Sequence, residues 1–535
     1  NIFKDRFSEI KKASEPLYKS PKSVQETIEI LKISESGIFE VADGKYSKIY
    51  RFSDVNYATR SEDEQESFFQ RYCKCLNSFD CTFKITVNNK NKDMDVLRNE
   101  VMLKYRNDGF DKMRESYNRI IEEKILEGRQ GIEQERYLTI TIERKNFEEA
   151  KAQFATIEAS MFRSFAELGS KLTPLTGNER LKILHDYYRL GREDEFNFDI
   201  RQGRITGTDF RNEICNTRIK YHPDYFEDEG KVGRVLFIKK YPTYLSDRFF
   251  TELTFLPVHS VTSVDVVPVP KDLTMKMLQK KYLGIESDII KQQRTRNRNN
   301  DFSSDISYAT RQKKKDIEEI MNNVRENDES LYYVSVTMIV MADDRDELES
   351  ICETVDSIAK GAGCAVDTCM YKQREAVNTT LPIGVRQIET MRTMLTQSLA
   401  VLMPFNVQEL CDRNGIYYGV NQISKNIIVG NRKKLLNGNG FIFGVSGAGK
   451  SFQAKMEMGS VLLSTDDNVI AVDPMNEYED VTEKYNGTYI NISTNTRNYI
   501  NPMDMDVWNL DVLDSKGWVR DKCQFMLSIC EQIMK

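Results

Sequence analysis

Strand-like and helix-like hydrophobic patterns follow one another along this chain, and one combination of the two occurs twice. In residues 137–143 alternate side chains are apolar, which predicts a strand with one buried face. An amphipathic helix follows, with Asn146 as its expected cap and Gly169 as its end. The same succession of strand, acid-capped helix and glycine returns between Tyr332 and Gly361. We therefore expect two related α+β halves built from ferredoxin-like βαβ units, although convergence of two unrelated units would give the same pattern.

Other local patterns surround these two halves. Residues 37–42 and 47–52 are β-like and are joined by a turn sequence, and a capping box predicts that a helix begins after Ser61. Residues 94–127 form a long, heavily charged stretch, which is typical of a helix that bridges solvent. Residues 387–402 are predicted to form a further helix.

A glycine-rich stretch near the end of the chain carries the strongest chemical signal. A short apolar run at 441–443 leads into Gly-Val-Ser-Gly-Ala-Gly-Lys-Ser at 444–451, and a helix-competent run follows. This fits the G-x-x-x-x-G-K-[ST] pattern of a P-loop, in which backbone N–H groups and the helix dipole bind phosphate. The alternative is a glycine-rich turn that matches by chance, but the predicted strand and helix favour the P-loop. The residues expected to bind ATP are Gly444, Ser446, Gly447, Ala448, Gly449, Lys450, Ser451 and Phe452.

Hydrolysis of ATP also needs a metal ion and a group that orients the attacking water. We expect Lys450 to act as a catalytic contact to the β- and γ-phosphates, and the Ser451 hydroxyl to bind Mg²⁺. Beyond the apolar run 469–473, Glu477 is the candidate water-orienting acid, and Asp473 is a candidate Mg²⁺ ligand through water. Another interpretation stays open, in which Asp473 caps the next helix and Glu477 supports its first turn.

The chain has 535 residues and a formal net charge of −6, which argues against a protein that binds nucleic acid with its whole surface. A local basic groove is compatible with this charge. One basic segment, 294–315, has two interpretations: a contact with DNA phosphates, or a solvated helix and loop. Because few aromatic residues are interleaved, we favour the second. Its basic residues are Arg294, Arg296, Arg298, Arg311, Lys313, Lys314 and Lys315.

The ten cysteines lack the paired spacing of a zinc site and are interpreted as reduced residues, mostly in apolar patterns, which fits a cytoplasmic compartment. The longest β-like apolar run, 332–342, is far too short to cross a bilayer. Because the sequence begins with Asn1, we expect the natural N-terminus to lie further upstream.

A series of motifs in this order resembles the ATPases of conjugative transfer and type IV secretion, the CagE/TrbE/VirB type. The approach to the P-loop and the sequence Asp-Pro-Met-Asn-Glu-Tyr at 473–478 are similar to that family's D-P-x-x-E-Y region. Three upstream stretches are similar to the family's K-x-Y-P-x-x-L-S-D, Q-x-x-A-x-x-x-x-L-P-x-G and R-T-x-x-x-x-x-L-A-x-x-x-P-F motifs. They occupy residues 241–247, 373–384 and 392–405.

The resemblance implies a cytoplasmic ATPase bound peripherally to the inner face of the cell membrane, from a Gram-positive conjugative element. It would energise assembly of a transfer channel or the transfer of DNA or protein substrates. The implied partners are membrane components of the channel and further copies of the chain, in a dimer or hexamer. The expected domains are an α+β region at 1–130, an α+β docking region at 131–405, and the first part of a RecA-like α/β P-loop domain of the FtsK/HerA kind at 406–535.

The chain departs from the family's pattern after the P-loop. The Asp-Glu pair that ends the family's Walker B strand does not follow Lys450 in this sequence. We therefore expect a C-terminally truncated chain that hydrolyses ATP poorly. Two other functions stay open: a FtsK/HerA-like DNA translocase, and a scaffold that nucleotide stabilises without hydrolysis.

Overall fold

The computed structural model divides the chain into two compact units. It describes residues 21, 23–91, 99, 101–127, 132–298, 308–326, 328–412, 414–422, 425–493, 496, 498, 501–504 and 515–534. The first unit, here called the sheet unit, comprises Asn1–Met102 and Asn118–Asn431. The second, the P-loop unit, comprises Leu103–Tyr117 and Arg432–Lys535. The division near residue 431 replaces the expected one at 405, and the expected boundary at 130 lies between two strands that pair with each other.

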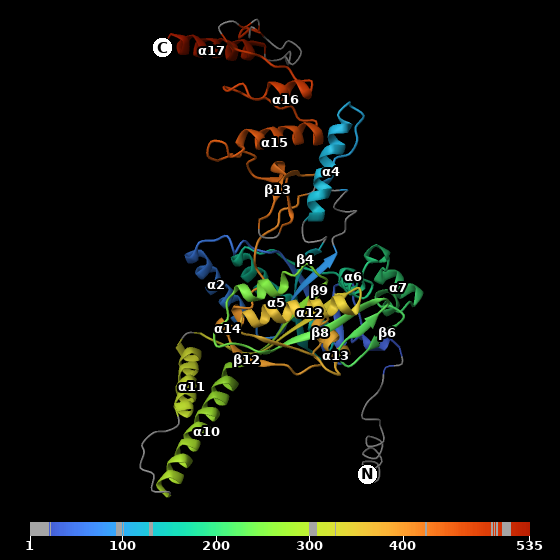
Figure 1. The fold of residues 1–535 in the computed structure, drawn as a ribbon, viewed down its shortest axis with the longest axis vertical. Coiled ribbons are helices and arrows are strands. Elements are labelled where there is room, and N and C mark those ends of the chain that lie inside the picture. Colours follow the sequence, from blue (N-terminus) through green and yellow to red (C-terminus); the bar gives the residue numbers. More distant parts are fainter. Residues whose placement is uncertain are drawn as a thin grey trace. The chain divides into compact units, whose positions relative to one another are not determined.

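The sheet unit is built on one twelve-stranded antiparallel sheet, in which two halves repeat one topology (Figure 1). In chain order each half runs strand, helix, strand, strand, helix, strand, and its sheet order is fourth, first, third, second, as in a ferredoxin-like unit. The first half contains, in sheet order, β5 (Leu172–Pro174), β2 (Lys45–Phe52), β4 (Ile132–Glu143) and β3 (Thr82–Asn91). The second contains β11 (Ala365–Thr368), β8 (Lys231–Lys240), β10 (Leu331–Ala342) and β9 (Ser260–Val269).

The two halves are joined by antiparallel pairing of β3 with β9, from Phe83 opposite Val266 to Asn89 opposite Ser260. Shorter strands extend the sheet at its two sides: β1 (Ile38–Ala42) at one, and β7 (Phe226–Asp228) and β6 (Ile219–Tyr221) at the other. A further short strand, β12 (Arg392–Leu395), pairs with the interior strand β10. A separate hairpin, β13 (Ile416–Val420) with β14 (Ile427–Gly430), precedes the P-loop unit in the chain.

Helices cover both faces of the sheet, because alternate strand residues point to opposite faces. In β10, Val336, Met338 and Val340 belong to one core, whereas Ile339 and Met341 belong to the other. The first core is closed by α2 (Glu62–Asn77), α5 (Phe147–Leu168), α9 (Arg248–Thr254), α12 (Arg345–Gly361) and α14 (Thr396–Ala400). The second is closed mainly by α6 (Gly177–Tyr188), α7 (Ile200–Thr206), α8 (Phe210–Ile214) and α13 (Gln373–Thr380). Of two short 3-10 turns, η1 (Gln25–Thr27) precedes β1 and η2 (Glu193–Glu195) lies between α6 and α7.

Local signals fix the ends of several helices. The Asn146 side chain accepts a 2.9 Å hydrogen bond from the Glu149 N–H, and Asp344 does the same for Glu347 at 2.9 Å. Gly169 ends α5 with a φ of +81°, in the left-handed region that glycine populates without steric cost. These caps begin and end the helices where the sequence predicts.

The predicted helix at 387–402 is wrong over its first half. Residues Arg392–Leu395 form β12, which pairs with Leu331–Val334 at the start of β10, and only α14 is helical. The open side of β10 here offers ladder hydrogen bonds, and these outweigh a weak helical pattern.

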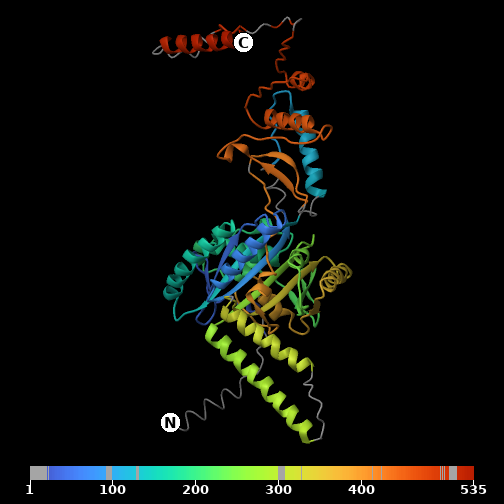
Figure 2. The same cartoon turned by 90° about the vertical axis from the view of Figure 1, so that its left-hand side faces the viewer.

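Each half carries a long insertion between its second and third strands. In the first half it contains α4 (Asp111–Glu127), so the helix predicted at 94–127 is shorter than expected. In the second half it is a hairpin of α10 (Lys271–Arg298) and α11 (Tyr308–Glu326) that extends away from the sheet (Figure 2). Lys314 of α11 pairs with Glu286 of α10 at 3.0 Å. None of the helices in the described residues is both long and apolar enough to cross a membrane.

The buried carboxyl group of Asp228 makes the stability of the sheet unit pH-dependent. Burial at the end of β7 raises its pKa to about 7, although the Asn216 amide donates a 2.7 Å hydrogen bond to it. Between pH 4 and 7 the folded state binds more protons than the unfolded state, so the free energy of unfolding falls as pH rises through this window. Asp228→Asn keeps an acceptor for Asn216 and removes the charge. We expect this variant to be more stable than the natural chain at pH 8 by about 2 kcal/mol, with the advantage vanishing near pH 4.

Urea unfolding at pH 4.5, 6 and 8 measures this difference. The matched control is Glu353→Gln, which changes an exposed acid on α12 and should leave the pH profile unaltered. Identical profiles for the Asp228 variant and the natural chain would contradict the assignment.

Candidate functional site

The predicted P-loop lies at the start of α15 (Lys450–Ser464) in the P-loop unit, with Gly449 as the N-cap residue. Gly447 and Gly449 have φ values of +79° and +86°, which side-chain-bearing residues adopt only with strain. Within the described residues no side chain caps this helix end. The N–H groups of its first turn are therefore available to an anion, which is the chemistry of a phosphate site.

Lys450 folds back over the loop. Its Nζ donates hydrogen bonds to the carbonyl oxygens of Gly444 at 2.8 Å and Val445 at 2.9 Å. A Cβ added to Gly444 would lie 3.2 Å from Cγ of Lys450, so glycine leaves the room that this lysine stem needs. The ammonium is thus held beside the curled backbone by carbonyl oxygens of its own loop, and its contact with a terminal phosphate stays a prediction.

The remaining first-turn residues differ in exposure. Ser451 is half-buried, and its hydroxyl makes no hydrogen bond within the described part of the chain, so it is free to bind Mg²⁺. Phe452 is 69% exposed. The loop residues Ser446 and Ala448 are also exposed, and the Ala448 N–H donates to the Val445 carbonyl at 3.2 Å. The donor set of loop amides, one ammonium and one hydroxyl fits a nucleoside triphosphate with Mg²⁺.

The Asp-Pro-Met-Asn-Glu-Tyr segment forms a turn held by its own first residue. The Asp473 carboxylate accepts from the N–H groups of Met475 at 3.2 Å and Tyr478 at 2.9 Å, and Tyr478 is the N-cap residue of α16 (Glu479–Lys484). The Lys455 ammonium of α15 lies 5.7 Å from the centre of the Tyr478 ring. Asp473 therefore stabilises the entry to α16, which agrees with the capping interpretation.

Glu477 is exposed and, within the described residues, makes no hydrogen bond or ion pair. No such contact joins Asp473 or Glu477 to Lys450 or Ser451 in the described structure either. The roles of Asp473 at Mg²⁺ and of Glu477 at the attacking water stay predictions.

The strands expected on either side of α15 are not formed. Residues 441–443 and 469–473 have no strand partner within the described residues, and their apolar side chains are exposed, with Phe443 at 87% and Val472 at 92%. Strands of a parallel sheet need paired neighbours and covered faces, and an apolar sequence does not supply either by itself. Besides α15 and α16, the P-loop unit contains η3 (Arg432–Lys434) and α17 (Ser515–Ile533).

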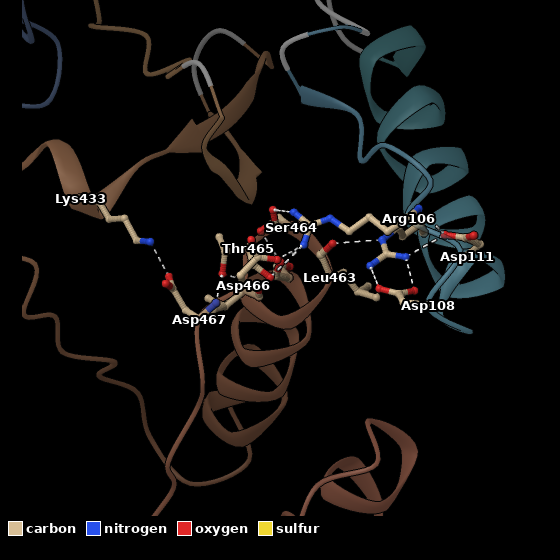
Figure 3. A network of polar contacts seen from close by, with 12 residues as sticks. Arg106, Asp108, Asp111, Lys433, Leu463, Ser464, Thr465, Asp466 and Asp467 are labelled. Atoms are coloured by element: carbon tan, nitrogen blue, oxygen red, sulfur yellow. Dashed lines mark hydrogen bonds and ion pairs between the residues drawn. The ribbon is translucent and has the colours of Figure 1, made fainter. Parts of the chain in front are cut away.

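Ion pairs fix α15 along its length. Glu457 pairs with Arg432 at 2.7 Å, and Asp467 just beyond the helix pairs with Lys433 at 2.6 Å, which lowers the pKa of Asp467 (Figure 3). At the same C-terminal end, Arg106 and Arg114 contact the last turn. The charged pattern of 94–127 did not reveal this contact, although the Asn-Asp-Gly sequence at 107–109 is a turn signal within it.

Two of the upstream motifs line one groove of about 820 Å³ in the sheet unit. Its walls include Tyr241, Tyr244 and Leu245 from the first motif, with Arg392 and Leu402 from the last. The middle motif is buried instead, and the Gln373 side chain accepts a 2.9 Å hydrogen bond from the Val235 N–H. The first and last motifs, which are distant in the sequence, thus line the same groove.

The basic segment maps onto the α10–α11 hairpin. Arg294 is exposed on α10, as are Lys313 and Lys315 on α11. Residues 299–307 lie outside the described residues, as do the side chains of Arg296 and Arg298.

Comparison with known proteins assigns a class to the P-loop unit. Residues 431–521 match the family model described as the central domain of the helicase HerA. The match covers the P-loop, α15 and the Asp473 turn, so this segment is similar to the ATPase domains of the FtsK/HerA P-loop superfamily. A comparison of the chain with curated proteins gives no match.

The left-handed glycines provide a test of the loop geometry. Gly449→Ala places a Cβ at a φ of +86°, which costs roughly 1–2 kcal/mol. We expect ATP affinity to fall about tenfold, because the loop would relax away from the conformation that presents its N–H groups. Titration with a fluorescent ATP analogue measures this.

The control for that titration is Gly284→Ala, at an exposed position within α10 where an added Cβ meets open space. It should leave ATP affinity unchanged. Full affinity in the Gly449 variant would contradict the phosphate-binding role of the loop.

Proposed function

We propose that this chain is the ATP-binding and hydrolysing motor of a conjugation or type IV secretion system. The observation that carries the proposal is the uncapped start of α15, with Lys450 held over the left-handed glycine loop. The HerA match supports an ATP-driven motor but does not distinguish a secretion motor from a DNA translocase.

Different groups of the loop would have different roles in phosphoryl transfer. Amides of residues 444–452 would hold the phosphate oxygens, and Lys450 would neutralise charge at the β- and γ-phosphates. Ser451 would hold Mg²⁺, with Asp473 contributing through water; the bound metal spreads the charge that develops on the phosphates. Glu477 would orient the attacking water from the turn beside α15.

The secretion role is supported by the upstream motifs. Residues 241–247 and 392–402 build one groove, although nearly 150 residues separate them in the sequence. We propose that the sheet unit docks on membrane components of the channel, so that the chain is peripheral on the cytoplasmic face, and that copies assemble as a dimer or hexamer.

The second candidate function is a DNA translocase of the FtsK/HerA group, and the basic α10–α11 hairpin favours it. Exposed cations such as Arg294, Lys313 and Lys315 would contact phosphates without reading base sequence. DNA-stimulated ATP hydrolysis with strand movement would favour this candidate, whereas stimulation by channel proteins alone would favour the first. A nucleotide-stabilised scaffold is the third possibility, and it predicts ATP binding without turnover.

Removing the lysine ammonium tests the motor assignment directly. Lys450→Ala should lower ATP affinity at least tenfold and abolish hydrolysis, because the positive contact to the terminal phosphates is lost. Isothermal titration and phosphate release measure the two effects. Lys455→Ala, one turn further along α15, is the control and should retain ATP binding; unchanged affinity in the Lys450 variant would refute the assignment.

Neutralising the tip of the hairpin tests the DNA contact. Substitution of Arg294, Arg296 and Arg298 by alanine should weaken duplex DNA binding and reduce the slope of log K against log salt by up to about 3, if each contacts one phosphate. The control triple variant replaces Lys276, Lys280 and Lys281, exposed residues nearer the start of α10. Equal DNA affinity and an equal salt slope in the natural chain and the tip variant would contradict the DNA contact and would support the interpretation of the segment as solvated surface.

A further inference from the structure

We infer that residues 103–117, here called the clamp, position the P-loop helix. Arg106 and Arg114 hold the C-terminal end of α15, so that ATP affinity at its other end depends on a segment inserted into the first half of the sheet unit. The inference rests on the proposed nucleotide-binding function and adds two positioning residues to it.

Arg114 is the centre of the clamp and is fully buried, with a relative exposure of 0%. Its guanidinium binds both carboxylate oxygens of Asp108, at 2.6 and 2.5 Å, and one oxygen of Asp111 at 2.7 Å. Its Nε donates to the carbonyl oxygen of Leu463, in the last turn of α15, at 3.1 Å. The two carboxylates thus compensate the buried charge and orient it toward the helix end.

Arg106 binds the other carbonyl oxygens at the C-terminal end of α15. It donates to the carbonyl oxygens of Ser464 at 2.7 Å and Thr465 at 3.2 Å, and it pairs with Asp466 at 2.7 Å. The last carbonyl groups of a helix lack intrahelical partners and carry the negative end of the helix dipole. Two arginines from outside the helix therefore satisfy three consecutive carbonyl groups, from Leu463 to Thr465, at this end of α15.

An apolar contact ties the clamp to the side of the same helix. The Phe110 ring lies 5.7 Å from the Tyr485 ring, centre to centre. The Tyr485 hydroxyl in turn lies so close to Gly459 of α15 that a Cβ there would approach it to 2.7 Å. The clamp thus contacts the helix end directly and reaches the helix side through Tyr485.

The connection matters because α4 continues beyond the clamp. The helix begins at Asp111 in the P-loop unit and ends at Glu127, in the part of the chain assigned to the sheet unit. Ile121 and Ile125 of its second half are buried side chains. α15 is a single helix from the P-loop to the clamped carbonyl groups, so a displacement at its phosphate-binding end must move the clamp or break its hydrogen bonds. This gives the sheet unit a covalent route to the nucleotide site.

The test uses the whole 535-residue chain and compares Arg114→Ala, Arg106→Ala and the control Arg119→Ala, which alters an exposed arginine on the same helix α4. Hydrogen exchange of residues 459–466 measures the clamp contact, and titration with a fluorescent ATP analogue measures the P-loop. We expect the first two variants to speed exchange and to weaken ATP binding about tenfold, the scale typical of losing hydrogen bonds to a charged group. The control should change neither quantity.

Arg114→Lys separates charge from geometry. It keeps the cation but loses the guanidinium fork, so it should recover only part of the lost affinity. If Arg114→Ala fails to fold, Arg106→Ala decides the question, because Arg106 is partly exposed and its loss leaves no buried charge unpaired.

Two results would overturn the inference. Faster exchange with unchanged ATP affinity would make the clamp a structural tie only, and unchanged exchange would show that its contacts do not hold α15. The natural chain and Lys450→Ala are measured alongside. Tight ATP binding by the first and weakened binding by the second show that the nucleotide site is intact, so a failure of the clamp is distinguished from a failure of the nucleotide site.

Discussion

The antiparallel pairing of β3 with β9 is the constraint on which the sheet unit depends. It turns two ferredoxin-like halves into one continuous sheet and buries the alternating residues of both on shared cores. Because Asn89 near the end of β3 lies opposite Ser260 at the start of β9, the two insertions leave the sheet at opposite ends of this strand pair. One insertion leads to the clamp, and the other forms the basic hairpin.

The P-loop helix is defined at both of its ends by different chemistry. Its start needs backbone freedom, which Gly447 and Gly449 provide, and leaves its N–H groups open to an anion. Its end is closed by guanidinium groups that satisfy the carbonyl oxygens. An anion at the positive end and cations at the negative end both stabilise the helix dipole. An anion bound at the start of α15 and the arginines at its end therefore both stabilise the same helix.

Short-range signals made much of this fold predictable. Asn146, Gly169 and Asp344 mark helix ends through hydrogen bonds and conformations that neighbouring residues determine, and the P-loop motif is equally local. The clamp was not predictable, since Arg114 and Leu463 are 349 positions apart and no periodicity links them. Strand pairing is likewise a long-range property. Residues 392–395 form a strand because they pair with β10, whereas residues 441–443 have no strand partner within the described chain.

The position of the two insertions has a consequence for engineering this protein. In a minimal ferredoxin-like unit, the second and third strands are joined by a tight turn that sets their register. Here both of these joints are long, so the register of β3 with β4 and of β9 with β10 is fixed by the strands themselves. The two joints differ in what they carry: that of the second half holds the α10–α11 hairpin, whereas a domain grafted within residues 103–117 of the first would interrupt the clamp.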